Sequence, residues 1–181
     1  MRYSHDHKAQ IHQRIIKEAS GHFRRDGISA TGLQPLMKSL GLTHGGFYAH
    51  FASKNDLVEK ALQHAAGEVD GICAELFSQA QPLHAFIDAY LSEWHVNSPH
   101  EGCPLTTMSA EMAQQGHAST TTDYVINARL KQIQNTLQGP DAEDQSIAIF
   151  SALVGALVLA RVAESKALRE QILDVTRSTL K

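Results

Sequence analysis

The chain has 181 residues, of which 43% are hydrophobic and 19% charged, a mix that is typical of a globular protein and excludes a disordered one. It has no uninterrupted apolar run of about eighteen residues and no apolar core near its start, so we expect neither a membrane span nor a secretory signal. With only Cys73 and Cys103 present, we expect no disulfide framework and a cytoplasmic location.

The net charge of −3 hides an asymmetry along the chain. Residues 1–64 carry nine Lys/Arg against five Asp/Glu, whereas the remaining residues carry seven against 14. A basic front on an acidic body indicates that only the front meets a polyanion. Chance clustering of surface charge remains the alternative to this interpretation.

Apolar residues recur every three or four positions from the start of the chain, which predicts helices. A first amphipathic helix ends at Gly27, because glycine accepts the left-handed geometry of a helix end. A short second helix has Pro35 in its first turn and ends at Gly41. We expect a very short third helix over about residues 44–50, and a long fourth helix that a capping sequence opens at residues 53–56.

The rest of the chain predicts five further helices, the first of which, the fifth of the chain, stops near Pro99. They are expected around the apolar residues of the stretches 86–94, 105–112, 119–138, 147–160 and 168–180. Because no stretch alternates with a period of two, we predict an all-α fold of about nine helices without a sheet. We expect two domains, residues 1–52 and residues 53–181, linked by the fourth helix.

The stretch from Gly27 to Leu62 carries the most chemical information. Two short helices that meet at a glycine turn are typical of a helix-turn-helix, whose second helix enters the major groove of DNA. Gly45 and Gly46 would let the backbone approach the DNA closely. Donors for the flanking phosphates are supplied by Thr43, His44, Tyr48, His50 and Lys54, and by the helix N-termini near Thr31 and Ser53.

The sequence GLTHGGFYAHFASKNDL, residues 41–57, resembles the signature of TetR-family (tetracycline-repressor-like) regulators. That signature has a glycine, a small hydroxyl residue, a Gly/small pair, Phe-Tyr, a further aromatic and Ser-Lys-x-x-Leu. The resemblance covers about residues 8–62. It implies an all-α subunit of about nine helices that acts as a homodimer. The first three helices would bind double-stranded operator DNA, and the C-terminal domain would bind an unknown small-molecule inducer. Repression is the more typical outcome in the family.

The resemblance also implies roles for single residues. Phosphate contacts would come from Thr31, Thr43, Tyr48 and Lys54, and positions near base edges or the DNA backbone would be held by His44, Gly45 and His50. Phe47 and Phe51 would anchor the motif in its own core, although a core contact for Tyr48 and a solvated position for Lys54 stay open. The chain departs from the family pattern at three positions, Gly32, Pro35 and His44, the last in place of a common lysine.

Aromatic residues and methionines on several C-terminal helices could line a cavity for an apolar or aromatic ligand. The predicted ligand-binding residues are Phe86, Tyr90, Trp94, Cys103, Met108, Met112, Tyr124 and Phe150. An ordinary bundle core is the alternative for each of them. Glu93, His95 and Glu111 are polar groups that could orient a ligand.

Cys103 lies in a Gly-Cys-Pro sequence at an expected helix start, where the helix dipole lowers the pKa of a thiol. Some TetR-like regulators carry a similar segment and some sense electrophiles through cysteine. Cys103 is therefore either a reactive sensor or a small buried residue at the start of a helix.

The eighth helix is apolar nearly all round and carries small residues, so several of its sides must be covered. We expect the eighth and ninth helices to form a four-helix bundle with a second subunit.

Two rival functions are less well supported by the sequence. An enzyme would need a catalytic motif, but the sequence lacks a phosphate-binding glycine loop, a nucleophile elbow and an H-E-x-x-H metal pair. We therefore expect no catalytic residue, metal or cofactor. A helical adaptor that binds protein instead of DNA is the other alternative, and the basic N-terminal bias argues against it.

Overall fold

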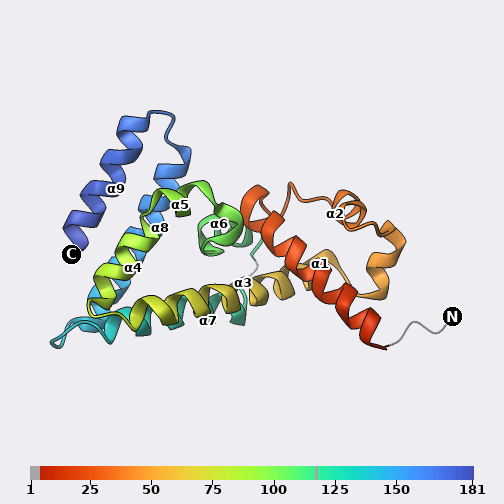
Figure 1. Ribbon diagram of the computed structural model, residues 1–181, viewed down its shortest axis with the longest axis horizontal. Helices are drawn as coiled ribbons and strands as arrows, with labels where there is room; N and C mark the ends of the chain where they lie inside the picture. The colour runs from red at the N-terminus through yellow and green to blue at the C-terminus, as the bar shows by residue number, and fades with distance from the viewer. Residues whose placement is uncertain (1–4, 117) are drawn as a thin grey trace.

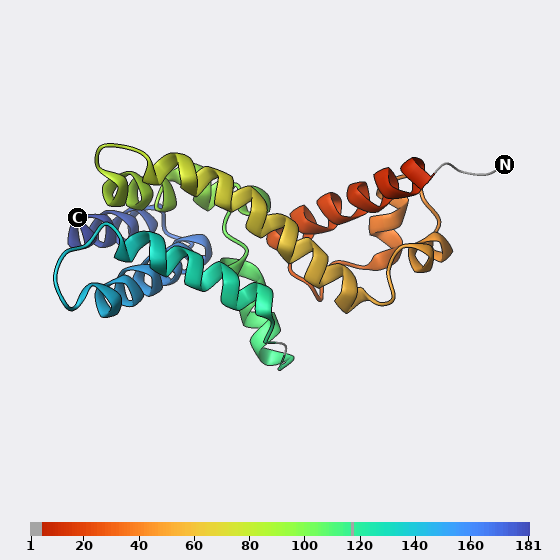
Figure 2. The same ribbon diagram turned by 90° about the horizontal axis from the view of Figure 1, so that it is seen from below.

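The computed structural model describes residues 5–116 and 118–181, which form nine α-helices, two short 3-10 helices and no strand. This confirms the predicted all-α fold. The helices make an elongated molecule, with the N-terminal elements at one end and a helical bundle at the other (Figure 1). The long helix α3 (Lys54–Phe77) runs from one end into the other and belongs to both (Figure 2).

The N-terminal unit consists of α1 (His5–Asp26), α2 (Leu33–Ser39), the 3-10 helix η1 (His44–Ala49) and the first turns of α3. Helix α1 packs along α3, and α2 packs against η1. The side chains between these elements exclude solvent, and Ile15, Phe23 and Phe47 are each 0% exposed. This small core fixes the orientation of η1 relative to α1.

Two glycines with positive φ end the first two helices as the sequence predicts. Gly27 has φ 93° and Gly41 has φ 73°, a region that side chains rarely adopt. After α2, the N–H of Leu42 donates to the carbonyl of Met37 at 2.9 Å and that of Gly41 donates to Lys38 at 3.0 Å. This is a Schellman ending, which satisfies the last carbonyls of α2 and turns the chain into η1.

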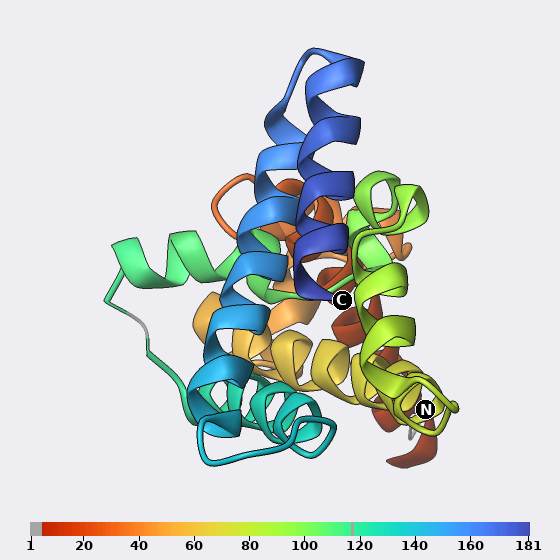
Figure 3. The same ribbon diagram turned by 90° about the vertical axis from the view of Figure 1, so that its left-hand side faces the viewer.

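The C-terminal elements are all helical and form a bundle with the second half of α3, which lies at its edge (Figure 3). They are α4 (Pro82–Tyr90), α5 (Glu93–Asn97), the 3-10 helix η2 (Pro99–Glu101), α6 (Leu105–Gln114), α7 (Thr120–Gln134), α8 (Ala142–Val162) and α9 (Lys166–Leu180). Helix α8 packs on both α7 and α9, while α4 packs on α3. The second hydrophobic core lies between these helices.

The predicted fifth helix is divided in the structure at Ser92. Its hydroxyl donates to the carbonyl of Ala89 at 2.8 Å and accepts from the N–H of His95 at 3.1 Å. Ser92 thus ends α4 and caps α5 at the same time, an alternative to continued helix that serine readily offers. The break turns α5 across the end of the bundle, where it helps to form a cavity.

Helix α8 is the one described helix that is long and apolar enough to cross a membrane. Length and composition are weak grounds for a span, because core helices pass the same test. Here α7 and α9 cover two of its sides. Its open side carries large exposed apolar side chains, namely Ile147, Val158, Leu159 and Val162.

Candidate nucleic-acid interface and ligand cavity

The surface of η1 and its two caps brings together five of the seven predicted DNA-binding residues, Thr43, His44, Gly45, Tyr48 and His50. Thr43 caps this helix, and its hydroxyl accepts the N–H of Gly46 at 3.2 Å. His44 and Gly45 are exposed, and nothing lies within 4 Å of the place where a side chain on Gly45 would begin. Tyr48 is 62% exposed, with its hydroxyl free to donate outward. The turn therefore offers donors beside a bare stretch of backbone, which is what close approach to DNA requires.

Phe47 and Phe51 hold this surface in place from below. Their rings stack at a centroid distance of 5.3 Å, and both are buried. The ring of His12 on α1 stacks on Phe51 at 4.6 Å, which ties η1 to the N-terminal half of α1. Phe47 and Phe51 thus lie in the core of the motif, as predicted from the resemblance.

His50 is only partly exposed and lies beside His12, with ring centroids 6.0 Å apart. Burial lowers the pKa of His50, and the nearby His12 and Lys8 lower it further. Burial and the charge of Lys60 also lower the pKa of His12. Both imidazoles are therefore neutral at pH 7 and add no charge to this part of the molecule.

Two predicted phosphate contacts lie elsewhere than on this surface. The hydroxyl of Thr31 is buried and donates to the carbonyl of Gly27 at 2.7 Å, so it closes the turn between α1 and α2. The ammonium of Lys54 donates to the carbonyl of Ile28 at 2.5 Å, and burial lowers its pKa. The hydroxyl of Thr31 thus uses its donor within the motif, whereas the ammonium of Lys54 keeps two further N–H donors, so its phosphate contact stays a prediction.

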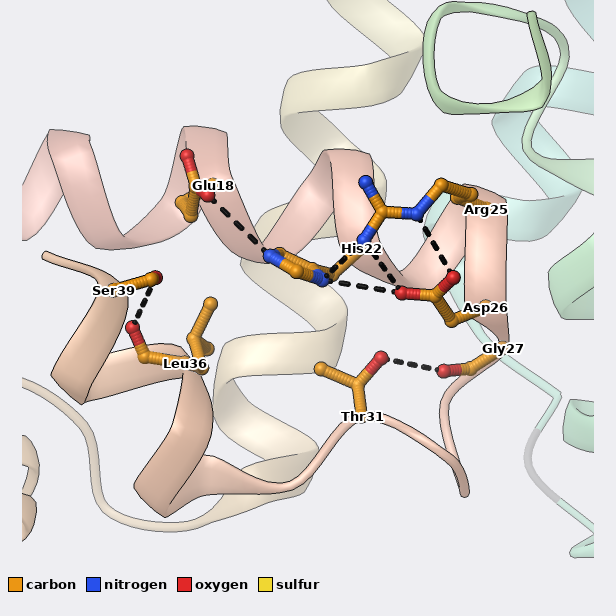
Figure 4. Close-up of polar contacts among 8 residues, drawn as sticks. All are labelled: Glu18, His22, Arg25, Asp26, Gly27, Thr31, Leu36 and Ser39. Atoms are coloured by element: carbon orange, nitrogen blue, oxygen red, sulfur yellow. Dashed lines mark hydrogen bonds and ion pairs between the residues drawn. The ribbon is translucent and has the colours of Figure 1, made fainter.

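An ion-pair network stiffens the end of α1 just before this turn (Figure 4). His22 lies between Glu18 at 3.3 Å and Asp26 at 3.2 Å, and Arg25 binds Asp26 at 2.8 Å. The hydrogen bond from Arg25 lowers the pKa of Asp26 to about 2. The positive charge of Arg25 is therefore paired with the carboxylate of Asp26 on the same helix.

The C-terminal domain contains a cavity of about 290 Å³ between α3, α4, α5 and α7. This volume lies at the lower end of the range for small-molecule sites. Most of the lining is apolar, and its residues are Val69, Ile72, Cys73, Leu76, Phe86, Ala89, Tyr90, Ser92, Trp94, His95, Glu101, Gly102, Cys103, Val125 and Arg129.

Four of the eight predicted ligand residues line this cavity: Phe86, Tyr90, Trp94 and Cys103. The other four do not. Met108 and Met112 face the opposite way and pack into the N-terminal core. Tyr124 is exposed and donates to Asp70 at 2.8 Å, and Phe150 lies behind Tyr90 with ring centroids 6.2 Å apart.

The pattern of apolar and aromatic residues could not separate these two groups. Both methionines lie on the face of α6 that packs against α1. Sequence spacing predicts which residues share a face of a helix, but it does not predict which helix packs against that face. Sequence reasoning also missed Cys73 and Arg129. A signal for Arg129 existed, because it follows a long stretch without Lys or Arg and occupies an apolar position between Val125 and Ile133.

His95 organises the floor of the cavity. Its Nδ1–H donates to the carbonyl of Tyr90 at 2.8 Å, and its Nε2 accepts the N–H of Cys103 at 3.0 Å. This arrangement needs a neutral ring, and burial lowers the pKa of His95 to about 4. A side chain on Gly102 would meet the imidazole at 2.5 Å, so only glycine fits there.

The thiols of the cavity are protonated. Burial raises the pKa of Cys103, opposite to the direction expected from its place at a helix start, and burial raises that of Cys73 to about 11. Cys103 precedes α6 in a closed environment and is 4% exposed. These features fit the small buried residue better than the reactive sensor.

The cavity wall is bonded directly to the N-terminal unit. Arg24 of α1 is 3% exposed and donates to the carbonyl of Gly102 at 3.2 Å and to Glu68 of α3 at 2.6 Å. Glu111 of α6 accepts the N–H groups of Ile28 at 2.8 Å and Ser29 at 2.7 Å. The turn that follows α1 is thus held by a residue of the C-terminal domain.

Known proteins share both the motif and the fold. Residues 15–61 match the family model "Bacterial regulatory proteins, tetR family". An uncharacterised HTH-type transcriptional regulator of Mycobacterium tuberculosis is 22% identical over 162 residues, which cover 83% of this chain and 84% of the relative.

Solved structures agree over nearly the whole chain. A TetR transcriptional regulator of Chloroflexus aurantiacus has a TM-score of 0.79 and 22% identity, covering 96% of this chain and 95% of its own. The TetR-family regulator of Cytophaga hutchinsonii has a TM-score of 0.78 and 17% identity, covering 96% and 94%. The solved structures show that the fold is shared, and the family-model match over residues 15–61 identifies the DNA-binding motif. The chain thus carries the DNA-binding motif of the tetR family of bacterial regulatory proteins on a fold that TetR-family regulators share, and it is a DNA-binding transcriptional regulator.

Proposed function

We propose that this regulator is a homodimeric, cytoplasmic repressor without enzymatic activity, and that it releases its operator when a small molecule occupies the cavity of the C-terminal domain. The recognition elements η1 of the two subunits would meet successive major grooves, about 34–36 Å apart. The ligand would favour a second arrangement of the dimer in which this spacing no longer fits. Operator affinity then falls by the difference in ligand affinity between the two arrangements.

The observation that carries this proposal is the bonded path from the cavity to the DNA-binding unit. Gly102 lines the cavity, and its carbonyl accepts a hydrogen bond from Arg24 on α1. Any ligand that moves Gly102 must stretch this bond or move α1 with it. The second link, from Glu111 to the backbone of Ile28 and Ser29, joins α6 to the turn that precedes α2. A movement of either C-terminal segment is therefore passed to the helix-turn-helix.

Dimerisation through α8 and α9 is supported by the apolar character of their open sides. Leu159 and Val162 on α8 are 55% and 74% exposed, and Val175 on α9 is 56% exposed. Small residues at Ser151 and Gly155 lie on the same side of α8 and permit close approach of a second helix. An apolar surface of this kind on a soluble protein marks an interface.

The experiment is fluorescence anisotropy of the full-length protein on duplex DNA from upstream of its own gene, with a scrambled duplex as control, over a salt series and with a panel of small molecules. We expect tight binding to the native duplex alone, weakening steeply with salt because phosphate contacts release counterions. A compound from the panel should then release the duplex while the protein stays dimeric. Specific binding that no compound weakens would contradict ligand control, and binding to neither duplex would favour the protein-binding adaptor.

The dimer interface is tested by Leu159→Glu, with Asn127→Glu on the exposed side of α7 as the matched control. A buried, unpaired carboxylate in the interface should cost about 3 kcal/mol or more, which is at least about a hundredfold in dimer affinity. Sedimentation velocity should show a monomer for Leu159→Glu and a dimer for Asn127→Glu. A dimeric Leu159→Glu protein would place the interface elsewhere.

A further inference from the structure

We propose that the cavity of the C-terminal domain takes a small monocarboxylate with an apolar body, whose carboxylate binds the Tyr90 hydroxyl and the Nε–H of Arg129. The inference rests on the proposed ligand-responsive function, because it names the chemical class that would occupy that site. Three observations support it: two polar groups of the lining lack a strong hydrogen-bond partner, the other polar groups are already bonded or hydrated, and the buried charges nearby favour an anion.

Two buried donors of the lining have no oxygen or nitrogen partner among the described residues, and only the thiols of Cys103 and Cys73, which accept weakly, lie within their reach. They are the hydroxyl of Tyr90, which is 5% exposed, and the Nε of Arg129, which is 2% exposed. A buried donor left unpaired costs free energy, so a site that retains two of them is suited to an acceptor that arrives with a ligand. Both donors lie near Cys73 and Cys103 in the cavity, since each affects the titration of these thiols.

The other polar groups of the lining are occupied. His95 uses Nδ1 on the carbonyl of Tyr90 and Nε2 on the N–H of Cys103. The hydroxyl of Ser92 is used twice in capping α5. Glu101 is an exposed residue beside His100, so its carboxylate is hydrated. Tyr90 and Arg129 therefore remain as the anchor for an acceptor group.

The charge around these donors favours an anion over a neutral acceptor. Arg129 donates to Asp70, which offsets one positive charge. Arg161 of α8 bonds to the carbonyls of His95 and Val96 and to the hydroxyl of Thr106, with no carboxylate among these partners. Both guanidinium groups act on Cys103 at the cavity wall, and the thiols and His95 are neutral there. Glu101 adds one negative charge to the lining, but its carboxylate is exposed and screened by solvent, whereas Arg161 is partly buried. The positive charge of Arg161 is therefore the less screened of the two and favours a carboxylate.

The body of the ligand is set by the remaining walls. The cavity is bounded on most sides by the aliphatic and aromatic side chains of α3, α4, α5 and α7, among them Leu76, Phe86 and Val125. Its volume of about 290 Å³ admits one short chain or one ring. The ligand class is therefore a short aliphatic or aryl-substituted carboxylic acid in its ionised form.

The test is calorimetric titration of the full-length dimer at neutral pH with three probes that share one body: octanoate, octan-1-ol and octylamine. We expect octanoate to bind at least about tenfold more tightly than octan-1-ol, since hydrogen bonds to a charged acceptor are the stronger ones. Octylamine should bind most weakly. Emission from Trp94, the one tryptophan and a lining residue, should change with octanoate and so report the location.

Two variants address the anchor. Tyr90→Phe keeps the ring and removes the hydroxyl, and Arg129→Lys keeps a charge for Asp70 but removes Nε–H. Each should lower octanoate affinity about tenfold and octan-1-ol affinity less. Arg169→Lys is the matched control, because its Nε is also buried without a partner but lies outside the cavity. Tyr90→Phe alone suffices if Arg129→Lys does not fold.

The inference is overturned if octan-1-ol or octylamine binds as tightly as octanoate, or if octanoate affinity is the same in Tyr90→Phe as in the unaltered protein. Anisotropy on the operator duplex separates it from the proposed function. Octanoate that binds at the cavity without releasing DNA would leave the ligand class standing and contradict ligand-controlled repression. Release of DNA by uncharged compounds, with no binding of carboxylates, would contradict the ligand class alone.

Discussion

The two hydrophobic cores of the molecule differ in how completely they are filled. In the N-terminal core, aromatic rings such as Phe23 and Phe47 are fully enclosed and pack against methionines delivered by α6. In the C-terminal core, several of the buried residues, among them Phe86 and Tyr90, border a cavity of about 290 Å³. A filled core holds a surface rigid for DNA, whereas an unfilled core leaves room for a ligand. The same class of residue therefore serves two functions, depending on what lies across from it.

The largest effect that would test this contrast is on stability. Phe47→Ala should lower the free energy of unfolding by about 4 kcal/mol, because a large ring is removed from a filled core. Trp94→Ala, which removes a larger side chain that is 52% exposed at the cavity, should cost far less. Urea denaturation of both variants gives the comparison. Equal losses would mean that the cavity is as tightly packed in solution as the N-terminal core.

Acid should destabilise the protein through the floor of the cavity. The pKa of His95 falls from 6.5 to about 4 on folding, so the unfolded chain takes up the proton first. Its contribution to stability is present above pH 6.5 and is lost as the pH falls toward 4, about 3 kcal/mol in all. His95→Gln should flatten this part of the curve of unfolding free energy against pH, while His100→Gln at an exposed position should leave its slope unchanged.

Operator binding should respond to the exposed tyrosine of η1 and not to that of α7. Tyr48→Phe removes one donor to a phosphate and should weaken operator binding about tenfold, with the salt dependence nearly unchanged because no charge is lost. Tyr124→Phe, at an equally exposed hydroxyl in the C-terminal domain, should bind as the unaltered protein does. Anisotropy titrations measure both. An unaffected Tyr48→Phe protein would move the interface away from η1.

The smallest expected effect concerns the link between the two regions. Burial opposes ionisation of Glu111, but hydrogen bonds from Ser29 and Ile28 and the charge of Lys54 lower its pKa, so it is ionised at pH 7. Glu111→Ala should cost about 1 kcal/mol of stability, since the group is partly solvated. It should also reduce the ratio of operator affinities without and with a releasing compound, leaving binding of that compound itself intact. Glu93→Ala, on the exposed side of α5, is the control.

Gly27 shows why that link is built into the backbone. It has positive φ, and a side chain there would clash with the carboxylate of Glu111. The sequence predicted the first role of Gly27, which is to end α1. Its second role, as the point where α6 approaches α1, depends on a residue more than eighty positions away and could not be predicted from local sequence.

The sequence by itself determined the helices and the DNA-binding motif. Glycine turns, capping residues and apolar spacing are local properties, so the ends of α1 and α2 and the surface of η1 follow from neighbours in the chain. The resemblance to TetR-family regulators predicted Phe47 and Phe51 correctly as core residues. The boundary at residues 52 and 53 stays a prediction, and α3 contributes to both cores on either side of it.

Only the tertiary structure decided which apolar side chains face a cavity and which fill a core. Met112 and Phe86 are both large apolar residues at helical spacing, yet Met112 on α6 packs into the N-terminal core while Phe86 on α4 lines the cavity. Likewise, Lys54 carries the expected donor, but folding places the carbonyl of Ile28, 26 residues away, against it. A side chain's chemistry is encoded locally, whereas its partners depend on the packing of whole helices, and that packing is what leaves a cavity in this bundle.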